Sequence, residues 1–306
     1  MNAGGADSSL HESSICAVVV TYQPDHLFAD RISRILRQVG AVVIVDNGSN
    51  AVATRLLREL AADLKITLHV NLENLGVASA LNIGIRHAIA LGCTWVLLLD
   101  QDSIVAENMV EELLAAREAY PHREKLAVIG SGFSDINRKT PVESGSAALW
   151  EEVNEVITSG SLIPLSVHAI VGPFRDEFFI DCVDIEYCLR ARAKGFLIIK
   201  TRKLLMLHAI GIYTQHRWLW RKRWTTNHPS ERRYYIARNG TLLLREYGTY
   251  PLGLWRLKSF LRCIQVCKRI ALHEESKTVK IIAVAQGWWD GITGNMQRKN
   301  GRRRPR

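Results

Sequence analysis

The stretch 94–103, TWVLLLDQDS, joins a short apolar run to two aspartates and decides the fold. Its apolar residues are continuous rather than alternating, which is typical of a strand buried on both faces of a parallel sheet. Asp100 and Asp102 follow at once, where such a strand ends. We therefore predict a buried strand over Thr94–Leu99 that delivers two carboxylates to one edge of a sheet.

Upstream of this stretch, short apolar runs alternate with segments of helical periodicity. This order is typical of an open, mostly parallel α/β sheet flanked by helices. Ligands bind such sheets beyond the carboxyl ends of the strands, so the polar clusters that end these runs should meet at one edge. We predict strands over Ile15–Tyr22, Ala41–Val45 and Thr67–Val70, and helices over Leu27–Val39, Val52–Asp63 and Asn74–Ala90.

Downstream, the periodicity is weaker over residues 130–171, which are rich in Gly and Ser. Residues 178–195 predict a loop that leads into a helix. The basic and aromatic segment 217–223 predicts a loop, and the chain from Tyr234 onward is mostly helical in pattern.

The net charge of +10 belongs to the C-terminal segment, because residues 249–306 hold 13 Lys/Arg against 3 Asp/Glu. The pattern there indicates an amphipathic basic helix. We predict three parts: a disordered N-terminus (1–14), an α/β domain (15–248) and a helical basic C-terminal segment with a disordered tail (249–306). The basic segment favours an anionic membrane surface, or else packs on the domain or forms a homodimer. The predicted sheet offers no stacking platform for nucleic acid.

The composition is that of a globular protein, with 47% hydrophobic and 23% charged residues. The six cysteines form no CxxC pair, which favours reduced thiols and a cytoplasmic location. The N-terminus has no basic region followed by an apolar one, and no apolar run reaches the roughly 18 residues of a membrane span. We expect a protein that is cytoplasmic, either soluble or peripheral on the inner face of the plasma membrane.

Asp100 and Asp102 have two interpretations. Paired carboxylates at a strand end suit a hard divalent cation, Mg²⁺ or Mn²⁺, shared with substrate phosphates. An Asp-x-Asp turn or a helix N-cap near Ser103 explains the same residues without a ligand. His208, in the apolar run LMLHAIG, is a candidate third ligand or a core histidine.

The other strand ends carry further candidates. Asp46 suits a contact to ribose or base, or else a plain Asx-turn at Asp-Asn-Gly. Asn74 and Gly76 open a helix rich in small residues, which allows a phosphate-bearing ligand to approach its N-terminus, or else allows tight helix–sheet packing. In FFIDCVDIEYCLRAR (178–192), Asp181 and Asp184 suit a general base, and acids also favour a helix N-terminus.

In their order, these motifs resemble family 2 glycosyltransferases with the GT-A fold, and most of all bacterial rhamnosyltransferases. RRYYIARN (232–239) is a weaker match. The matching stretches are VVVTYQPD (18–25), VVIVDNGS (42–49), ENLGVASALNIGI (73–85), WVLLLDQDS (95–103) and FFIDCVDIEYCLRARAKGF (178–196).

The resemblance implies a role for each matching position. Asp102 would hold the metal, with His208 completing its site, and Asp184 would be the catalytic base. Many relatives carry Glu-Asp where this chain has Val183-Asp184, so Asp181 is the substitute base. The nucleotide-sugar pocket would be lined by Thr21, Tyr22, Asp46, Asn74, Gly76 and Asp100, with Asp100 near the ribose.

The implied activity is inverting transfer of a sugar, with L-rhamnose from dTDP-L-rhamnose favoured. The acceptor would be a hydroxyl of a glycan or lipid-linked molecule in surface polysaccharide synthesis. A UDP-sugar donor and a degenerate relative that only binds glycan are the alternatives.

Overall fold

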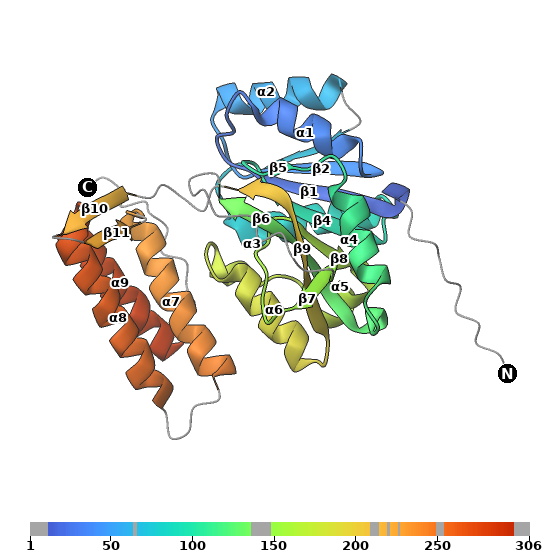
Figure 1. The fold of residues 1–306 in the computed structure, drawn as a ribbon. Helices are drawn as coiled ribbons and strands as arrows, with labels where there is room; N and C mark the ends of the chain where they lie inside the picture. The colour runs from blue at the N-terminus through green and yellow to red at the C-terminus, as the bar shows by residue number, and fades with distance from the viewer. Residues whose placement is uncertain are drawn as a thin grey trace.

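The computed structural model describes residues 12–63, 66–135, 148–208, 214–218, 221–225, 227–248 and 254–296. Within them, a nine-stranded sheet is flanked by helices on both faces, and a layer of C-terminal helices lies beside it (Figure 1). The strand order is β3-β2-β1-β4-β8-β6-β9-β5, with β7 paired to β9. The predicted fold class is confirmed.

The first half of the chain forms the parallel part of the sheet, as expected. β1 pairs with β2 on one side and β4 on the other, and β2 pairs with β3, all in parallel. The elements are β1 (Ile15–Thr21), α1 (Phe28–Leu36), β2 (Ala41–Asp46), α2 (Ala51–Asp63), β3 (Ile66–Val70), α3 (Val77–Ala90) and β4 (Trp95–Asp100).

The continuous apolar run of β1 has a direct structural cause. Ile15 and Val19 belong to a core cluster with residues of α1 and α4, whereas Cys16 and Val18 belong to a second cluster with residues of α3. Because successive side chains point to opposite faces, both faces of this strand need apolar residues.

The second half of the sheet is mixed. β8 runs antiparallel to both β4 and β6, while β6 and β9 are parallel. The elements are β5 (Ile104–Val105), α4 (Met109–Glu118), β6 (Leu126–Asp135), β7 (Trp150–Glu152), β8 (Ser161–Pro164), α5 (Leu165–Val171), α6 (Val183–Ala193) and β9 (Leu197–His208), with 3₁₀ turns η1 (Glu12–Ser14), η2 (Arg123–Lys125) and η3 (Asp176–Phe178).

Three helices follow the sheet: α7 (Ser230–Tyr247), α8 (Leu254–His273) and α9 (Lys277–Thr293). In Figure 1, α7 lies between the sheet and the other two helices. No helix of the described ranges is long and apolar enough to cross a membrane. The expectation of disorder over residues 1–14 is wrong for 12–14, which form the 3₁₀ turn η1. Residues 1–11 and the tail 301–306, for which we also expect disorder, lie outside the described residues.

The expectation of a loop over 217–223 is wrong. β10 (Thr214–Trp218) and β11 (Arg221–Thr225) form an antiparallel hairpin in which Arg217 pairs with Lys222. The segment lacks the apolar alternation that marks a half-buried strand, so its sequence carries no strand signal.

Candidate active site

The carboxyl ends of the four parallel strands meet at one edge of the sheet. In the strand register, Thr21 lies opposite Asp46, Asp46 opposite Val70, and Val20 opposite Asp100. The predicted polar clusters therefore lie next to one another, on consecutive strands.

Asp46 organises the end of β2. Its fully buried carboxylate accepts hydrogen bonds from the Thr21 hydroxyl (3.1 Å), the Ser49 hydroxyl and the Ser49 backbone N–H (3.1 Å). The carboxylate thus bonds the backbone N–H three residues on, at Ser49, and not two residues on as in an Asx-turn. It fixes the loop after β2 beside the end of β1.

An asparagine network joins this loop to the start of α3. The Asn47 amide donates to the Asn74 side-chain oxygen at 3.0 Å, and Asn71 donates to Asn47 at 3.1 Å. The same Asn74 oxygen accepts the Gly76 backbone N–H at 2.9 Å. Sequence reasoning missed Asn47, although it lies beside Asp46 in the polar cluster.

Gly76 brings the start of α3 against the loop that carries the acidic motif. Its φ is +87°, and the Val77 N–H donates to the Phe179 carbonyl at 2.6 Å. A Cβ on Gly76 would lie 2.7 Å from both the Cα and the carbonyl oxygen of Phe179. Gly76 thus serves the close approach of the helix start to this loop, and not the helix–sheet packing that the sequence allows as an alternative.

Gly76→Ala should lower the free energy of unfolding by about 3 kcal/mol or more, because positive φ and collision with the backbone both oppose a side chain. Gly92→Ala is the matched control, with φ of +76° but no atom within 4 Å of the added Cβ, and should cost only about 1 kcal/mol. Chemical denaturation of both variants measures the difference. Equal losses would show that the Phe179 contact is unimportant.

Asp100, Asp102 and His208 form the only group of at least three His, Cys, Asp or Glu side chains that could hold a metal ion in the described ranges. Their ligand atoms all lie within 4.8 Å of one another. His208 Nδ1 is 3.4 Å from Asp102 Oδ1, and His208 Nε2 is 3.8 Å from Asp100 Oδ2. His208 ends β9, so two distant strands supply this cluster.

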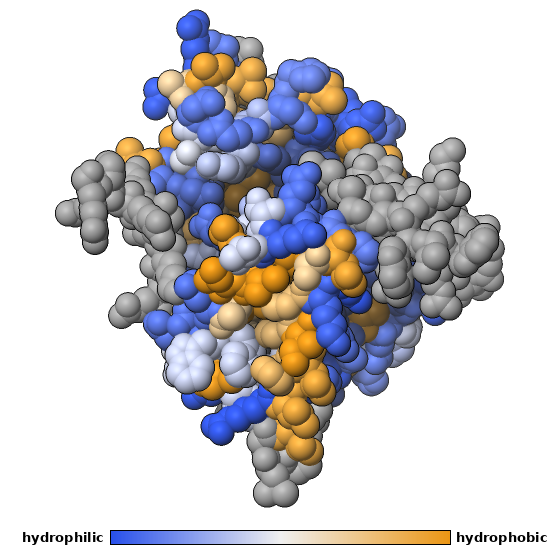
Figure 2. Space-filling model, turned by 90° about the vertical axis from the view of Figure 1, so that its left-hand side faces the viewer, coloured by the Kyte–Doolittle hydropathy of each residue, from blue (hydrophilic) through white to orange (hydrophobic). Residues whose placement is uncertain are grey.

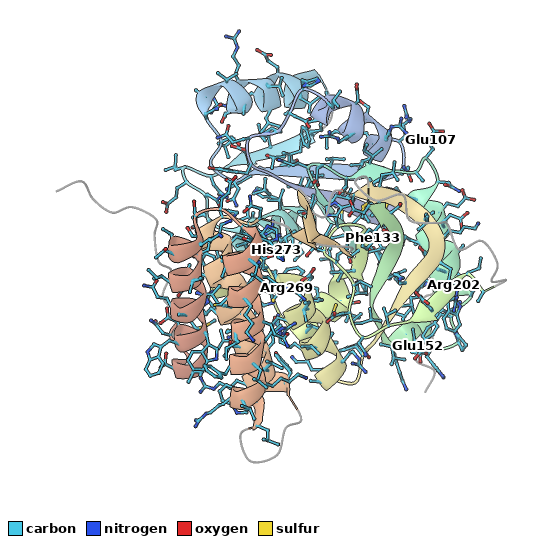
Figure 3. The ribbon with its side chains drawn as sticks, turned by 60° about the vertical axis from the view of Figure 1, so that its left-hand side comes forward. Glu107, Phe133, Glu152, Arg202, Arg269 and His273 are labelled. Atoms are coloured by element: carbon cyan, nitrogen blue, oxygen red, sulfur yellow. The ribbon has the colours of Figure 1, made fainter. Side chains whose placement is uncertain are left out.

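Two serines hold the cluster. Ser159 Oγ accepts a hydrogen bond from the Asp100 backbone N–H at 3.1 Å. It also lies 2.6 Å from Ser103 Oγ. Ser103 Oγ in turn lies 3.3 Å from His208 Nδ1. The ring of Phe133 meets His208 edge to face, and Figure 3 labels Phe133 beside this edge of the sheet. No sequence signal pointed to Ser159.

The electrostatics fit a cation site. Burial and the neighbouring charge of Asp102 raise the pKa of Asp100, against the opposing effect of His208. Burial lowers the pKa of His208, but the hydrogen bond that its ring donates to Asp102 and the charge of Asp100 raise that pKa overall. Two carboxylates and an imidazole at this spacing are oxygen and nitrogen donors suited to a divalent cation.

Gln101, between the two aspartates, links them to β1. Its side-chain oxygen accepts the Tyr22 N–H at 2.7 Å, and its amide nitrogen donates to the Tyr22 carbonyl at 3.1 Å. Arg31 donates to the Gln101 carbonyl at 3.1 Å. Gln101 is a further residue that sequence reasoning missed.

Asp184 lies in the first turn of α6. Burial, together with the charges of Asp100 and Asp181, raises its pKa to about 6, against the opposing effect of backbone hydrogen bonds. It lines a cavity of about 220 Å³ together with Phe133, Glu155 and Lys200. A carboxylate with this pKa suits a general base near neutral pH.

Asp181 has a different environment from Asp184. Arg232 of α7 donates to both of its carboxylate oxygens, with Nε–Oδ2 and Nη2–Oδ1 distances of 3.0 Å. A carboxylate held by a two-pronged arginine contact is tied to that partner. Of the two acids, Asp184 is therefore the better placed to take a proton.

Helix α7 fixes the loop that precedes Asp184. The buried Asn239 amide donates to the carbonyls of Phe178, Ile180 and Asp181 at 2.8, 3.0 and 2.8 Å. Phe179, Asp181 and Cys182 all have positive φ, a strained backbone that this contact stabilises. RRYYIARN was only a weak motif in the sequence, because its partners lie about 60 residues away.

A mixed sheet with an Asp-x-Asp turn at the end of a parallel strand, a histidine beside it and a half-buried carboxylate whose pKa the charge of Asp100 raises is typical of a GT-A type glycosyltransferase. The chain belongs to glycosyl transferase family 2, whose sequence profile matches residues 16–175.

Among curated proteins, the dTDP-rhamnosyl transferase RfbF of Shigella flexneri is 32% identical over 255 residues, which cover 76% of this chain and 81% of RfbF. The galactofuranosyltransferase GlfT1 of Mycolicibacterium smegmatis is 31% identical over 105 residues, 33% of each protein.

Solved structures share the fold at low sequence identity. The mannosyltransferase PcManGT of Pyrobaculum calidifontis, in complex with GDP-Man and Mn²⁺, has a TM-score of 0.57 at 14% identity, covering 92% of this chain and 88% of PcManGT. The structure of residues 1–349 of S. aureus TarS has a TM-score of 0.57 at 12% identity, covering 92% of this chain and 82% of the TarS chain. Against a longer TarS structure the chain spans 44% of the length, at a TM-score of 0.52.

Proposed function

We propose that this protein transfers L-rhamnose from dTDP-L-rhamnose to a hydroxyl group of a glycan or lipid-linked acceptor in surface polysaccharide synthesis, with inversion at the anomeric carbon. The observation that carries the proposal is the Asp100–Asp102–His208 cluster with Asp184, whose pKa is raised in part by Asp100. The rhamnose donor is favoured by the likeness to RfbF, which covers most of both chains.

The donor set fits a divalent cation, and in this proposal Asp102 and His208 are its ligands. Mn²⁺ accompanies GDP-Man in PcManGT, and Mg²⁺ has the same preference for oxygen ligands. Such an ion neutralises the charge that develops on the departing nucleoside diphosphate. Asp100 lies toward the ribose, and the ends of β1 and β2 and the start of α3 form the nucleotide pocket. Its proposed lining residues are Thr21, Tyr22, Asp46, Asn74 and Gly76.

Asp184 performs the proton transfer. Its carboxylate accepts the proton of the acceptor hydroxyl as that oxygen attacks the anomeric carbon from the face opposite the leaving group. The bond to the new oxygen forms as the bond to the diphosphate breaks, so one displacement inverts the configuration. Asp181 stays paired with Arg232 and keeps the loop in place.

Donor turnover tests the proposal. Purified protein is incubated with dTDP-L-rhamnose, UDP-glucose, UDP-GlcNAc or GDP-mannose, with Mn²⁺ or with excess EDTA. We expect nucleoside diphosphate release from dTDP-L-rhamnose at least about tenfold faster than from the others, and only with metal. Faster turnover of a UDP-sugar would show that the donor is that UDP-sugar and not dTDP-L-rhamnose. Glycan binding without turnover of any donor would favour the non-catalytic alternative.

We further place the protein in the cytoplasm, at the inner face of the plasma membrane. The support is the basic C-terminal segment together with the lipid-linked class of acceptor.

A further inference from the structure

Helices α8 and α9 lie beyond α7 from the sheet (Figure 1), and both expose large apolar side chains. Seen from the side on which these helices lie, hydrophobic residues gather over the centre and lower part of the molecule (Figure 2). Side chains that are about half exposed form stripes at helical spacing along both helices. They are Leu254, Leu257, Leu261 and Leu272 on α8, and Ile282 and Trp289 on α9.

Between these stripes lies an apolar groove of about 430 Å³. It is lined by Phe260, Ile264 and Ala271 of α8 and by Ile281, Val284 and Trp288 of α9. The stripes and the groove together make one continuous surface, which we name the α8–α9 face. Monomeric proteins rarely leave such a surface uncovered without a binding role.

The charge around this face is nearly all of one sign. Lys258, Arg262 and Arg269 are exposed and follow one another at helical spacing along α8, next to the Leu257 and Leu261 stripe. Exposed Arg256, Lys268 and Lys277 add to them. Of the three acids between residues 254 and 293, Glu274 and Asp290 are buried, so Glu275, in the turn between α8 and α9, is the single exposed acid of this range.

Part of the basic stripe lies near the loop that precedes Asp184. The charge of Arg262 lowers the pKa of the Cys182 thiol, two residues before Asp184, although burial raises that pKa overall. Figure 3 shows Arg269 and His273 on the part of α8 turned toward the sheet. Arg262 of the basic stripe thus lies near the loop that precedes Asp184.

We propose that the α8–α9 face docks on the surface of an anionic lipid bilayer, with its apolar stripes inserted among the acyl chains and its basic stripe on the phosphate headgroups. An amphipathic helix with an apolar stripe beside a basic stripe binds in the plane of a membrane interface. Lys and Arg near an anionic surface each favour binding. A homodimer through the same face would bring two like-charged stripes together, which opposes that arrangement. The inference does not depend on the identity of the donor.

Vesicle flotation of the full-length protein tests the docking. We expect binding to vesicles of phosphatidylcholine with phosphatidylglycerol, weaker binding to phosphatidylcholine alone, and loss of binding at high salt. Leu261→Glu with Ile282→Glu should reduce binding at least about tenfold, because two charges then face the acyl chains. The triple variant Arg262→Gln, Lys268→Gln, Arg269→Gln should also reduce binding about tenfold or more, with binding to neutral vesicles unchanged.

Ile89→Glu is the matched control, since Ile89 is 54% exposed on α3 and Leu261 is 49% exposed on α8. This control should float like the wild type. All variants should release nucleoside diphosphate from the donor in solution at the wild-type rate, which separates docking from catalysis. Wild-type flotation by the Leu261→Glu, Ile282→Glu variant would overturn the proposal. So would a stable wild-type dimer in sedimentation analysis that this variant dissociates.

Discussion

Asp184→Asn should lower kcat by about a thousandfold or more, because general base catalysis contributes 10²–10⁴-fold and the amide cannot accept the proton. Donor binding should change little, since Asp184 lies on α6 and the proposed nucleotide pocket is built from the ends of β1 and β2 and the start of α3. Steady-state kinetics with saturating donor and Mn²⁺, together with calorimetric titration of the donor, measure the two effects separately.

Stability shows whether the Asp184→Asn loss is catalytic. Folding raises the pKa of Asp184 to about 6, so the folded state favours the protonated carboxyl. The contribution of this carboxyl to the free energy of unfolding is lost as the pH rises through 6. The variant should therefore be more stable than the wild type at pH 8, by about 1–3 kcal/mol, and should lose this advantage below pH 4. Asp30→Asn, an exposed aspartate on α1, should change neither activity nor stability. Near-normal turnover by Asp184→Asn would refute the assignment of the base.

Asp102→Ala should abolish metal-dependent binding of the donor and lower kcat/KM by about a thousandfold or more. The variant removes one of the two proposed ligands of the cation, and a metal contributes several kcal/mol to transition-state stabilisation. Mn²⁺ titration followed by electron paramagnetic resonance measures the site directly, without turnover.

Glu107→Ala is the matched control for Asp102→Ala. Glu107 is an exposed carboxylate five residues further along the chain, and Figure 3 shows it at the outer edge of the molecule. Its removal should leave Mn²⁺ affinity and turnover at wild-type values. If Asp102→Ala bound Mn²⁺ as tightly as this control does, the cation site would have to be placed elsewhere.

The first half of the fold could be read from the sequence because its signals are local. The runs at β1, β2 and β4 are buried on both faces, so each reads as a strand by itself, and each ends in a polar cluster. Once those strands are parallel and adjacent, their carboxyl ends must meet. The neighbourhood of Asp46 and Asp100 follows from this.

The remainder depends on contacts between distant residues. β8 lies antiparallel between β4 and β6, but the direction of a four-residue strand cannot be read from its sequence. Ser159 contacts Asp100 across 59 residues, and Asn239 holds the Asp181 loop across 58. A single serine or asparagine is not part of a periodic pattern, so the sequence does not indicate its distant partner. The same is true of the basic hairpin β10–β11.

The proposed role of Asp184 is that of a base and not a nucleophile, and the stereochemistry of the product tests this role most directly. Nuclear magnetic resonance of the glycoside formed from dTDP-L-rhamnose gives the anomeric configuration of the new bond. Direct displacement assisted by Asp184 predicts a configuration opposite to that of the donor. A product with the configuration of the donor would require a double displacement through a covalent intermediate, and would contradict the role assigned to Asp184.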